Sequence, residues 1–349
     1  MRRALLGALL LGMGCAGSGP VRVEPFPGER RFAGLRQLTF GGENAEAYWS
    51  FDFTSLVFQS TRPPFTADQI FTMGADGSRQ TLVSTGKGRT TCAYYLPGDK
   101  KILYASTHAA SDAPPPPPDR SQGYVWPIHA EYEIYLADAD GGNPVNLTRR
   151  RGYDAEATVS PLGDRIVFTS MRDGDLDLYS MKLDGSGVRR LTDRPGYDGG
   201  AFFSWDGRKI VWRAPAEDDD VTKGDYAALL ARGLVRPSRL EIWVMDADGS
   251  NKRQVTRFGK ASFAPFWHPD DRRIIFSSNL GDPKGRNFDL YLIAEDGTGL
   301  ERVTFFERAG DDFDGFPMFD REGKRLVFCS NRRNAHPNET NVFIADWRE

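Results

Sequence analysis

The sequence repeats itself, and the length of the repeat restricts the fold more than any other feature. The segment Ala155–Thr192 divides into four short strands, with turns that include Pro161–Asp164 and the hairpin dipeptide Asp184-Gly185. Its closing Leu-Thr phrase recurs in related form with successive spacings of 44, 65, 44, 64 and 48 residues, starting at Leu38, Leu82, Leu147, Leu191, Val255 and Val303. One four-stranded meander cannot bury two faces alone, so its copies must stack against one another.

Six copies with a period near 44 residues predict an all-β fold, a six-bladed β-propeller with four-stranded blades. A β-solenoid is the alternative, but solenoid repeats are usually shorter. The last repeat, Phe313–Trp347, stops after its third strand, whereas an additional strand, Leu35–Phe40, precedes the first full repeat. We therefore expect the N-terminal strand to complete the last blade and close the ring.

The repeat resembles that of the TolB-type propeller, a WD-like repeat shared with tricorn-like proteins and prolyl-oligopeptidase propellers. The matching residues are Ser160–Asp164, Phe168–Gly174, Tyr179 with Met181, and Asp184–Ser186, and the resemblance extends over about Gly34–Trp347. It implies the propeller without the N-terminal domain of TolB and without a peptidase domain. Such propellers serve as docking platforms in some proteins and as gates to a catalytic domain in others, so the resemblance leaves the function open.

The N-terminus has the pattern of a secretory signal. Two arginines, Arg2 and Arg3, precede the apolar run Ala4–Met13, which is too short to span a bilayer. The following Cys15 resembles the cleavage site of a bacterial lipoprotein, with a plain signal peptide as the alternative. We expect a lipoprotein-type signal peptide at 1–15, a flexible tether at 16–33 and the propeller at 34–349. This organisation predicts a lipid-anchored protein on the periplasmic side of the cell envelope, in the outer membrane.

The charge of the chain argues against nucleic acid and anionic lipid as general partners. The formal net charge is −3, so no general affinity for nucleic acid or for anionic lipid is implied. We expect contact with the membrane only through the lipid anchor, and a monomeric propeller.

Two repeats are lengthened by insertions, at about 107–131 and 215–239. The first contains five consecutive prolines, Pro114–Pro118, followed by Tyr124, Trp126 and Ile128, which are too apolar for a free loop. The second contains a segment with a helical pattern, Asp225–Arg232. Both insertions join the second and third strands of a blade, so both are expected on the face where the innermost strands begin.

Aligned repeats place carboxylates at the start of the innermost strands, and hence around the channel mouth. The predicted ligand-binding residues are Asp154, Asp198 and Asp314, with Glu156 and Glu46 one inward-facing position deeper. No basic residue occupies either set of aligned positions, and converging carboxylates suit a cation or a basic peptide. The alternative is that each aspartate caps its own turn by accepting hydrogen bonds from nearby backbone N–H groups.

Catalytic motifs are absent from the sequence: it has no nucleophile elbow, Walker loop or H-E-x-x-H pattern. Some related propeller lyases hold a metal with histidines over the channel, which makes His108, His129 and His336 metal-ligand candidates, although no spacing supports them. A divalent cation in the channel is the one cofactor that we consider.

Two functions remain open. The favoured one is a lipid-anchored envelope protein whose propeller binds a protein or peptide through its channel mouth and insertion face. The alternative is a stand-alone envelope enzyme, a hydrolase or lyase acting on a peptide or glycan at a metal-assisted site.

Lipidation can be tested on the intact chain. If Cys15 carries the lipid, the wild-type protein should partition into the detergent phase, and Cys15→Ser should yield a water-soluble periplasmic form. Phase partitioning and mass spectrometry of the mature N-terminus are the measurements. A soluble wild-type protein with an unmodified N-terminus would contradict the prediction.

Overall fold

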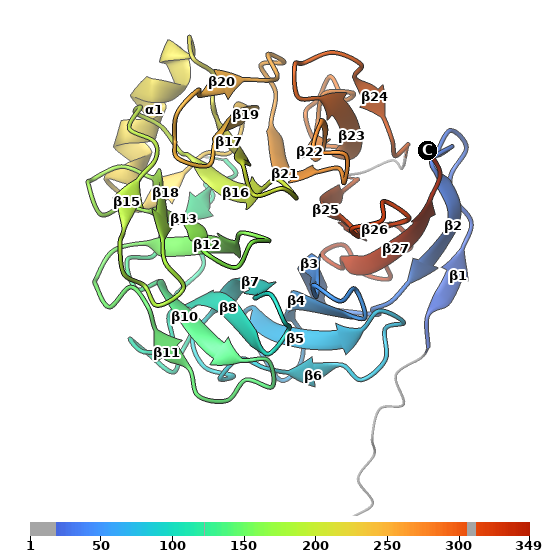
Figure 1. Cartoon of the computed structure of the whole chain (residues 1–349), viewed down its shortest axis with the longest axis horizontal. Helices are drawn as coiled ribbons and strands as arrows, with labels where there is room; N and C mark the ends of the chain where they lie inside the picture. The colour runs from blue at the N-terminus through green and yellow to red at the C-terminus, as the bar shows by residue number, and fades with distance from the viewer. Residues whose placement is uncertain (1–18, 122, 306–311) are drawn as a thin grey trace, which may run out of the picture.

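The computed structural model describes residues 19–121, 123–305 and 312–349. Its β-sheets are arranged as six blades around a common axis, and the chain passes from one blade to the next in sequence order (Figure 1). The innermost strand of each blade lies next to the axis, and the later strands lie progressively outward. Among the described residues no helix has the length and apolar character needed to cross a membrane. The predicted six-bladed β-propeller is confirmed.

The first three blades each contain four antiparallel strands. Blade one consists of β3 (Glu43–Trp49), β4 (Ser55–Thr61), β5 (Gln69–Gly74) and β6 (Thr81–Leu82). Blade two consists of β7 (Thr90–Tyr95), β8 (Lys101–Ser106), β10 (Glu133–Asp138) and β11 (Val145–Asn146). Blade three consists of β12 (Asp154–Val159), β13 (Ile166–Ser170), β14 (Asp177–Met181) and β15 (Arg189–Arg190).

The remaining blades follow the same plan, except that the last has five strands. Blade four consists of β16 (Gly199–Phe203), β17 (Lys209–Pro215), β19 (Leu240–Asp246) and β20 (Arg253–Gln254). Blade five consists of β21 (Ser262–Trp267), β22 (Arg273–Ser278), β23 (Asp289–Ala294) and β24 (Glu301–Arg302). Blade six consists of β25 (Asp314–Phe319), β26 (Arg325–Ser330), β27 (Asn341–Trp347), β2 (Phe32–Gln37) and β1 (Val21–Val23).

The two ends of the chain meet in blade six. β2 pairs with β27, with Leu35 opposite Ala345, and beyond β2 the Leu38 N–H donates to the Val342 carbonyl at 2.8 Å. The N-terminal strand therefore closes the ring, three residues earlier than Leu35–Phe40 would place it. β1 then pairs with β2 as a fifth strand. The flexible tether predicted at 16–33 is thus wrong for residues 21–23, 32 and 33, which belong to the last blade.

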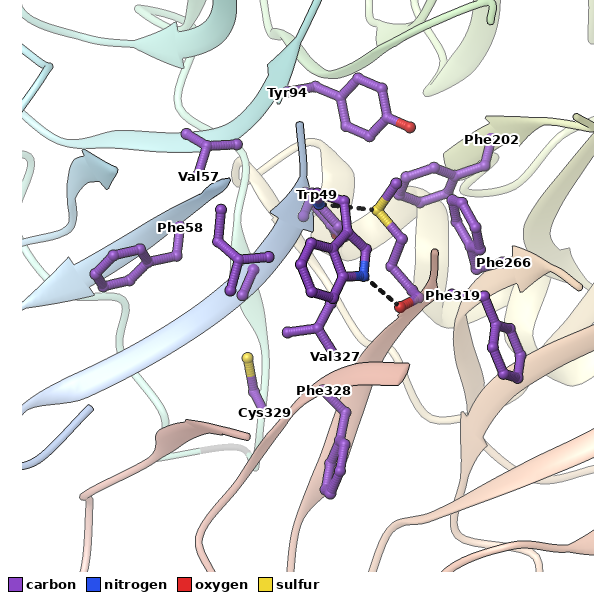
Figure 2. Packing of buried hydrophobic residues seen from close by; sticks show 14 of the residues in the cluster. Trp49, Val57, Phe58, Tyr94, Phe202, Phe266, Phe319, Val327, Phe328 and Cys329 are labelled. Atoms are coloured by element: carbon purple, nitrogen blue, oxygen red, sulfur yellow. Dashed lines mark hydrogen bonds between the residues drawn. The ribbon is translucent and has the colours of Figure 1, made fainter. Parts of the chain in front are cut away.

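Aromatic rings fill the space near the axis. The rings of Tyr48, Tyr94 and Phe202 lie 5.4 to 5.9 Å apart, and Phe266 lies 5.2 Å from Phe202. Next to them the buried Trp49 donates its indole N–H to the Met318 carbonyl of blade six at 3.2 Å (Figure 2). Burial of a large aromatic side chain contributes about 1.5–3 kcal/mol, so this packing is a large part of what holds the blades together.

The two insertions lie over blade three and contact each other. The first contributes β9 (Trp126–Pro127) and the second contributes β18 (Leu234–Val235), and these two strands pair as a separate two-stranded sheet. The second insertion also forms α1 (Asp220–Leu230), which begins five residues before the helical segment predicted from the sequence. We call this assembly of β9, β18 and α1 the lid. Its buried core joins Ile128, Val235 and Tyr226 to Tyr153 of blade three.

A buried ion-pair triad fastens the N-terminal segment to blade six. The Arg332 guanidinium donates to both carboxylate oxygens of Glu29, at 2.9 and 3.2 Å, and to Asp314 at 3.0 Å. The side chains of all three residues are fully buried. Removing one member of such a triad leaves a charge in the interior without its partner.

We therefore expect Glu29→Ala to lower the free energy of unfolding by about 3–5 kcal/mol, because Arg332 would lose two charge-assisted hydrogen bonds. Urea-induced unfolding measures the loss. Glu24→Ala is the matched control: Glu24 is 84% exposed in a loose pair with Arg22, so its removal should cost under about 0.5 kcal/mol. Equal effects of the two substitutions would show that the triad does not fasten the segment.

Candidate functional site at the ring axis

Every innermost strand carries a β-bulge at the same aligned position. The strand register shifts there in all six blades, and the residue at the shift has a positive φ of 50° to 60°. These residues, which we call the bulge ring, are Glu46, Cys92, Glu156, Gly200, Ala264 and Phe316. A bulge bends its strand and re-aims the side chain. Five of the six are not glycine, and a left-handed conformation costs such a residue about 1–2 kcal/mol.

The bulge ring is polar on one side and apolar on the other. Glu46, Cys92 and Glu156 follow one another in blades one to three, whereas blades four to six contribute Gly200, Ala264 and Phe316. All except Ala264 retain partial solvent exposure. The deeper of the two predicted sets of aligned positions therefore coincides with the bulge ring.

The three predicted aspartates are buried within their blades and do not belong to the bulge ring. Asp154, Asp198 and Asp314 are at most 5% exposed and contact side chains of their own blades. Asp154 pairs with Arg172 at 3.1 Å, and Asp314 pairs with Arg332. The prediction of an acidic mouth without basic residues is therefore wrong, because the arginines come from the end of the second strand, outside the aligned positions. The turn-capping alternative also fails to describe Asp154 and Asp314, whose cationic partners are side chains.

A repeated Ser-x-Arg sequence at the end of the second strand explains this burial. In blade three the Arg172 guanidinium donates to Ser170 Oγ at 2.9 Å and to Asp154, and it lies over the Phe168 ring, 5.0 Å from its centroid. Arg62 of blade one and Arg332 of blade six make the corresponding contacts. We call the place that this guanidinium fills the guanidinium slot.

A hydrogen-bonded network built around Glu156 joins blades three and four. Glu156 accepts hydrogen bonds from Arg213 at 2.6 Å, from the Tyr197 hydroxyl at 2.5 Å and from the Gly200 N–H at 2.8 Å. Thr169 donates to the second carboxylate oxygen at 3.0 Å. These donors, with Arg213 foremost among the favourable ones, outweigh burial and lower the pKa of Glu156, so the carboxylate is held charged.

Two consecutive glycines make room for this network. A Cβ on Gly200 would collide with the Arg213 guanidinium, and one on Gly199 would lie 2.8 Å from the Tyr197 ring and collide with the Glu156 carboxylate. The missing side chains allow Arg213 to extend across the bulge ring. The Arg213 guanidinium also lies 4.8 Å from the centre of the Tyr197 ring and 5.2 Å from that of Trp126. Trp126 of the lid therefore contacts Arg213 and Tyr197, both hydrogen-bonded to Glu156 of the bulge ring.

Glu46 differs from Glu156 because it has no ion pair with a described residue. Burial, reinforced by the charge of Glu156, raises its pKa to about 7, while a hydrogen bond with the Cys92 thiol and the distant Arg213 act in the opposite direction. A carboxyl group that titrates near neutral pH can give and take protons. Its aligned position could be found from the repeat, but its pKa depends on neighbours from other blades.

The three predicted metal ligands are not assembled into a site. His108 Nδ1 shares a hydrogen bond with Ser106 Oγ at 2.8 Å, and its ring is tilted by 44° against the Tyr135 ring, 4.4 Å away, in blade two, where it takes the place of the Ser-x-Arg arginine. His129 packs near Tyr132, and His336 is exposed on the loop before β27. Among the described ranges no group of three histidine, cysteine or acidic residues could hold a metal ion.

These features define the protein as a six-bladed β-propeller with a ring of bulges at its axis, polar on one side, and a two-part lid beside it. Its fold is of the TolB type. The putative TolB of Agrobacterium tumefaciens superposes with a TM-score of 0.57 and 18% identity over 88% of this chain and 91% of that chain. TolB of Acinetobacter baumannii gives 0.56 and 17% over 88% of this chain and 64% of that chain.

An enzyme shares the same architecture. An oligogalacturonate lyase in complex with manganese superposes with a TM-score of 0.54 and 12% identity over 95% of this chain and 98% of that chain. At these identities the structural similarities show the fold alone.

The sequence comparison covers a smaller part of the chain than the structural comparisons do. The Tol-Pal system protein TolB of Thioalkalivibrio sulfidiphilus is 35% identical over 69 residues, which are 20% of this chain and 15% of that protein. This chain thus covers 15% of the length of the curated relative that it matches. No protein-family model matches the chain.

The raised pKa of Glu46 predicts a pH-dependent stability. Between about pH 4.5 and 7 the folded protein holds a proton that the unfolded chain has released, so this group destabilises the fold as the pH rises through that window. Glu46→Gln should therefore be more stable than the wild type by about 1–3 kcal/mol at pH 8 and nearly equal to it at pH 4.5. Urea unfolding at both pH values tests this, with Glu24→Gln as an exposed control. A gain that is equal at both pH values would contradict the assignment.

Proposed function

We propose that the protein is a component of a bacterial cell envelope and that its propeller binds another protein or a peptide through the face that carries the lid. The observation that carries this proposal is the lid itself. Two segments about 110 residues apart in the sequence meet as β9 and β18, and they present Trp126 beside the bulge ring. An ordered surface at the open end of a ring is a common docking place in repeat folds.

The segment that leads into β9 of the lid has the composition of a protein interface. Tyr124 is 59% exposed, and the Arg120 guanidinium lies 5.0 Å from the centre of its ring. Tyrosine, tryptophan and arginine are enriched where proteins bind one another. The similarity to proteins named TolB, one of them described as a Tol-Pal system protein, supports an envelope role. Lipidation of Cys15, which lies outside the described residues, would place the lid on the periplasmic side of the outer membrane.

A second candidate function is catalysis on a peptide or glycan at the ring axis. The observation that favours it is Glu46, whose pKa of about 7 suits a general acid or base. The lyase with the same fold does not identify a catalytic residue in this chain. The histidines proposed as metal ligands do not converge among the described residues. We therefore prefer the binding function.

Site-specific photocrosslinking tests the binding function in cells. A photoreactive amino acid at Tyr124 should yield a crosslinked adduct with an envelope protein. Leu162 is the matched control, because it is 65% exposed and lies on the turn between the first two strands of blade three, at the opposite end of the innermost strand from the lid. Adducts at both positions with equal yield, or at neither, would contradict the proposal.

A further inference from the structure

The guanidinium slot is not filled in the same way in blade four. The aligned acid is present as Asp198, but the Ser-x-Arg sequence is replaced by Ala214-Pro215-Ala216. The cross-strand aromatic pair that forms the floor of the slot is also present, as Trp212 and Trp243 with their rings 5.9 Å apart. Blade four therefore keeps the acid and the aromatic pair of the slot and lacks its own arginine.

The consequence is that Asp198 lacks the ion pair with an arginine of its own blade. Its Oδ1 accepts a hydrogen bond from the Trp212 indole at 2.6 Å, and within the described residues it has no ion pair. By contrast, Asp154 and Asp314 each pair with the arginine of their own blade. Burial raises the pKa of Asp198 well above its usual range, and the nearby Asp177 and Asp175 raise it further, while the Trp212 hydrogen bond and the charge of Arg194 act in the opposite direction. Asp198 is 5% exposed, so this acid is enclosed, and Arg194 acts on it without forming an ion pair.

A crevice marks the place of the missing arginine. It is open to solvent, and it is lined by Asp198, Trp212, Trp243, Ala214 and Pro215 together with the interblade loop. A floor of aromatic rings beside an acid is what a guanidinium recognises.

Arg194 fills only part of the slot. It reaches in from the interblade loop, and its guanidinium lies 4.8 Å from the centre of the Trp243 ring while donating to the Glu217 carbonyl at 3.2 Å. In blades one and three the slot arginine lies over both rings of the pair, at 4.6 to 5.3 Å from their centroids. The other cation of the crevice, Lys252, is directed to the Gly249 carbonyl at 2.7 Å.

We propose that this crevice binds the guanidinium group of an arginine side chain of a partner protein or peptide, with Asp198 as the counter-ion and the Trp212–Trp243 pair as the stacking surface. The chain itself supplies the precedent, because blades one, three and six bind an arginine of their own in the corresponding slot. The slot lies at the end of β17 from which the second insertion, part of the lid, continues. The inference rests on the proposed binding function only in assigning the arginine to a bound protein.

Calorimetric titration with two short peptides tests the slot directly. The probes are acetylated and amidated Gly-Arg-Gly and the same peptide with citrulline, which has nearly the shape of arginine but no charge. The wild-type protein should bind the arginine peptide at least about tenfold more tightly, a difference of about 1.4 kcal/mol. Asp198→Asn should abolish this preference. Equal binding of the two peptides, no binding of the arginine peptide at millimolar concentration, or an unchanged preference in Asp198→Asn would overturn the proposal.

Two further variants separate ligand binding from folding. Ala214→Ser combined with Ala216→Arg restores the Ser-x-Arg sequence, so it should fill the slot internally, raise the melting temperature and remove peptide binding. Asp154→Asn changes the equivalent acid of blade three, whose slot Arg172 already fills, and should leave peptide binding unchanged. If the restored blade bound the arginine peptide like the wild type, or if Asp154→Asn lost binding like Asp198→Asn, the slot would not be the site.

The outcome is independent of the crosslinking experiment. If the arginine peptide fails to bind while Tyr124 still forms adducts, the slot proposal fails and the lid remains a docking surface. If the peptide binds and no adduct forms at Tyr124, the slot stands as an arginine site and the lid proposal fails.

Discussion

The pairing of β2 with β27 is the interaction on which the rest of the structure depends. A ring of stacked blades has no free end only when the last blade receives its outer strand, because an unpaired edge exposes a row of backbone donors and acceptors. Here the strand comes from a segment some 300 residues away in the sequence. The Glu29–Arg332–Asp314 triad then secures that segment with a buried charge network, so closure depends on backbone and side-chain contacts at once.

Arginines in the guanidinium slots stabilise the individual blades, as the closing strand stabilises the ring. In blades one, three and six a guanidinium links the first strand, the second strand and an aromatic pair within one sheet. The unit recurs because the strand register brings the aligned position opposite a serine, as in Asp154 opposite Ser170. In blade five, serines occupy both positions, and the Ser262 hydroxyl donates a hydrogen bond to Ser278 Oγ at 3.0 Å. The acid of blade four is the exception, and this mismatch is visible only when all six repeats are compared in three dimensions.

The sequence predicts the fold in considerable detail because period, turns and strands all repeat. It predicts the number of blades, the closing strand and the face of the insertions. It also locates the bulge ring, because Glu46 and Glu156 occupy one aligned position. The sequence does not give the direction in which these acidic side chains point. The bulge turns Glu156 toward Arg213, whereas the regular strand before it turns Asp154 toward Arg172. The β1 strand is missed because three residues in a Gly/Pro-rich segment carry too weak a pattern.

The lid joins two insertions of the chain that belong to different blades, two and four. Each contributes a strand of only two residues, and each of those strands finds its partner in the other insertion. Neither insertion could therefore be lost alone without leaving a short unpaired strand and an uncovered apolar surface, including Ile128 or Val235, at the edge of the ring. A change that removes one insertion is therefore expected to require a matching change in the other.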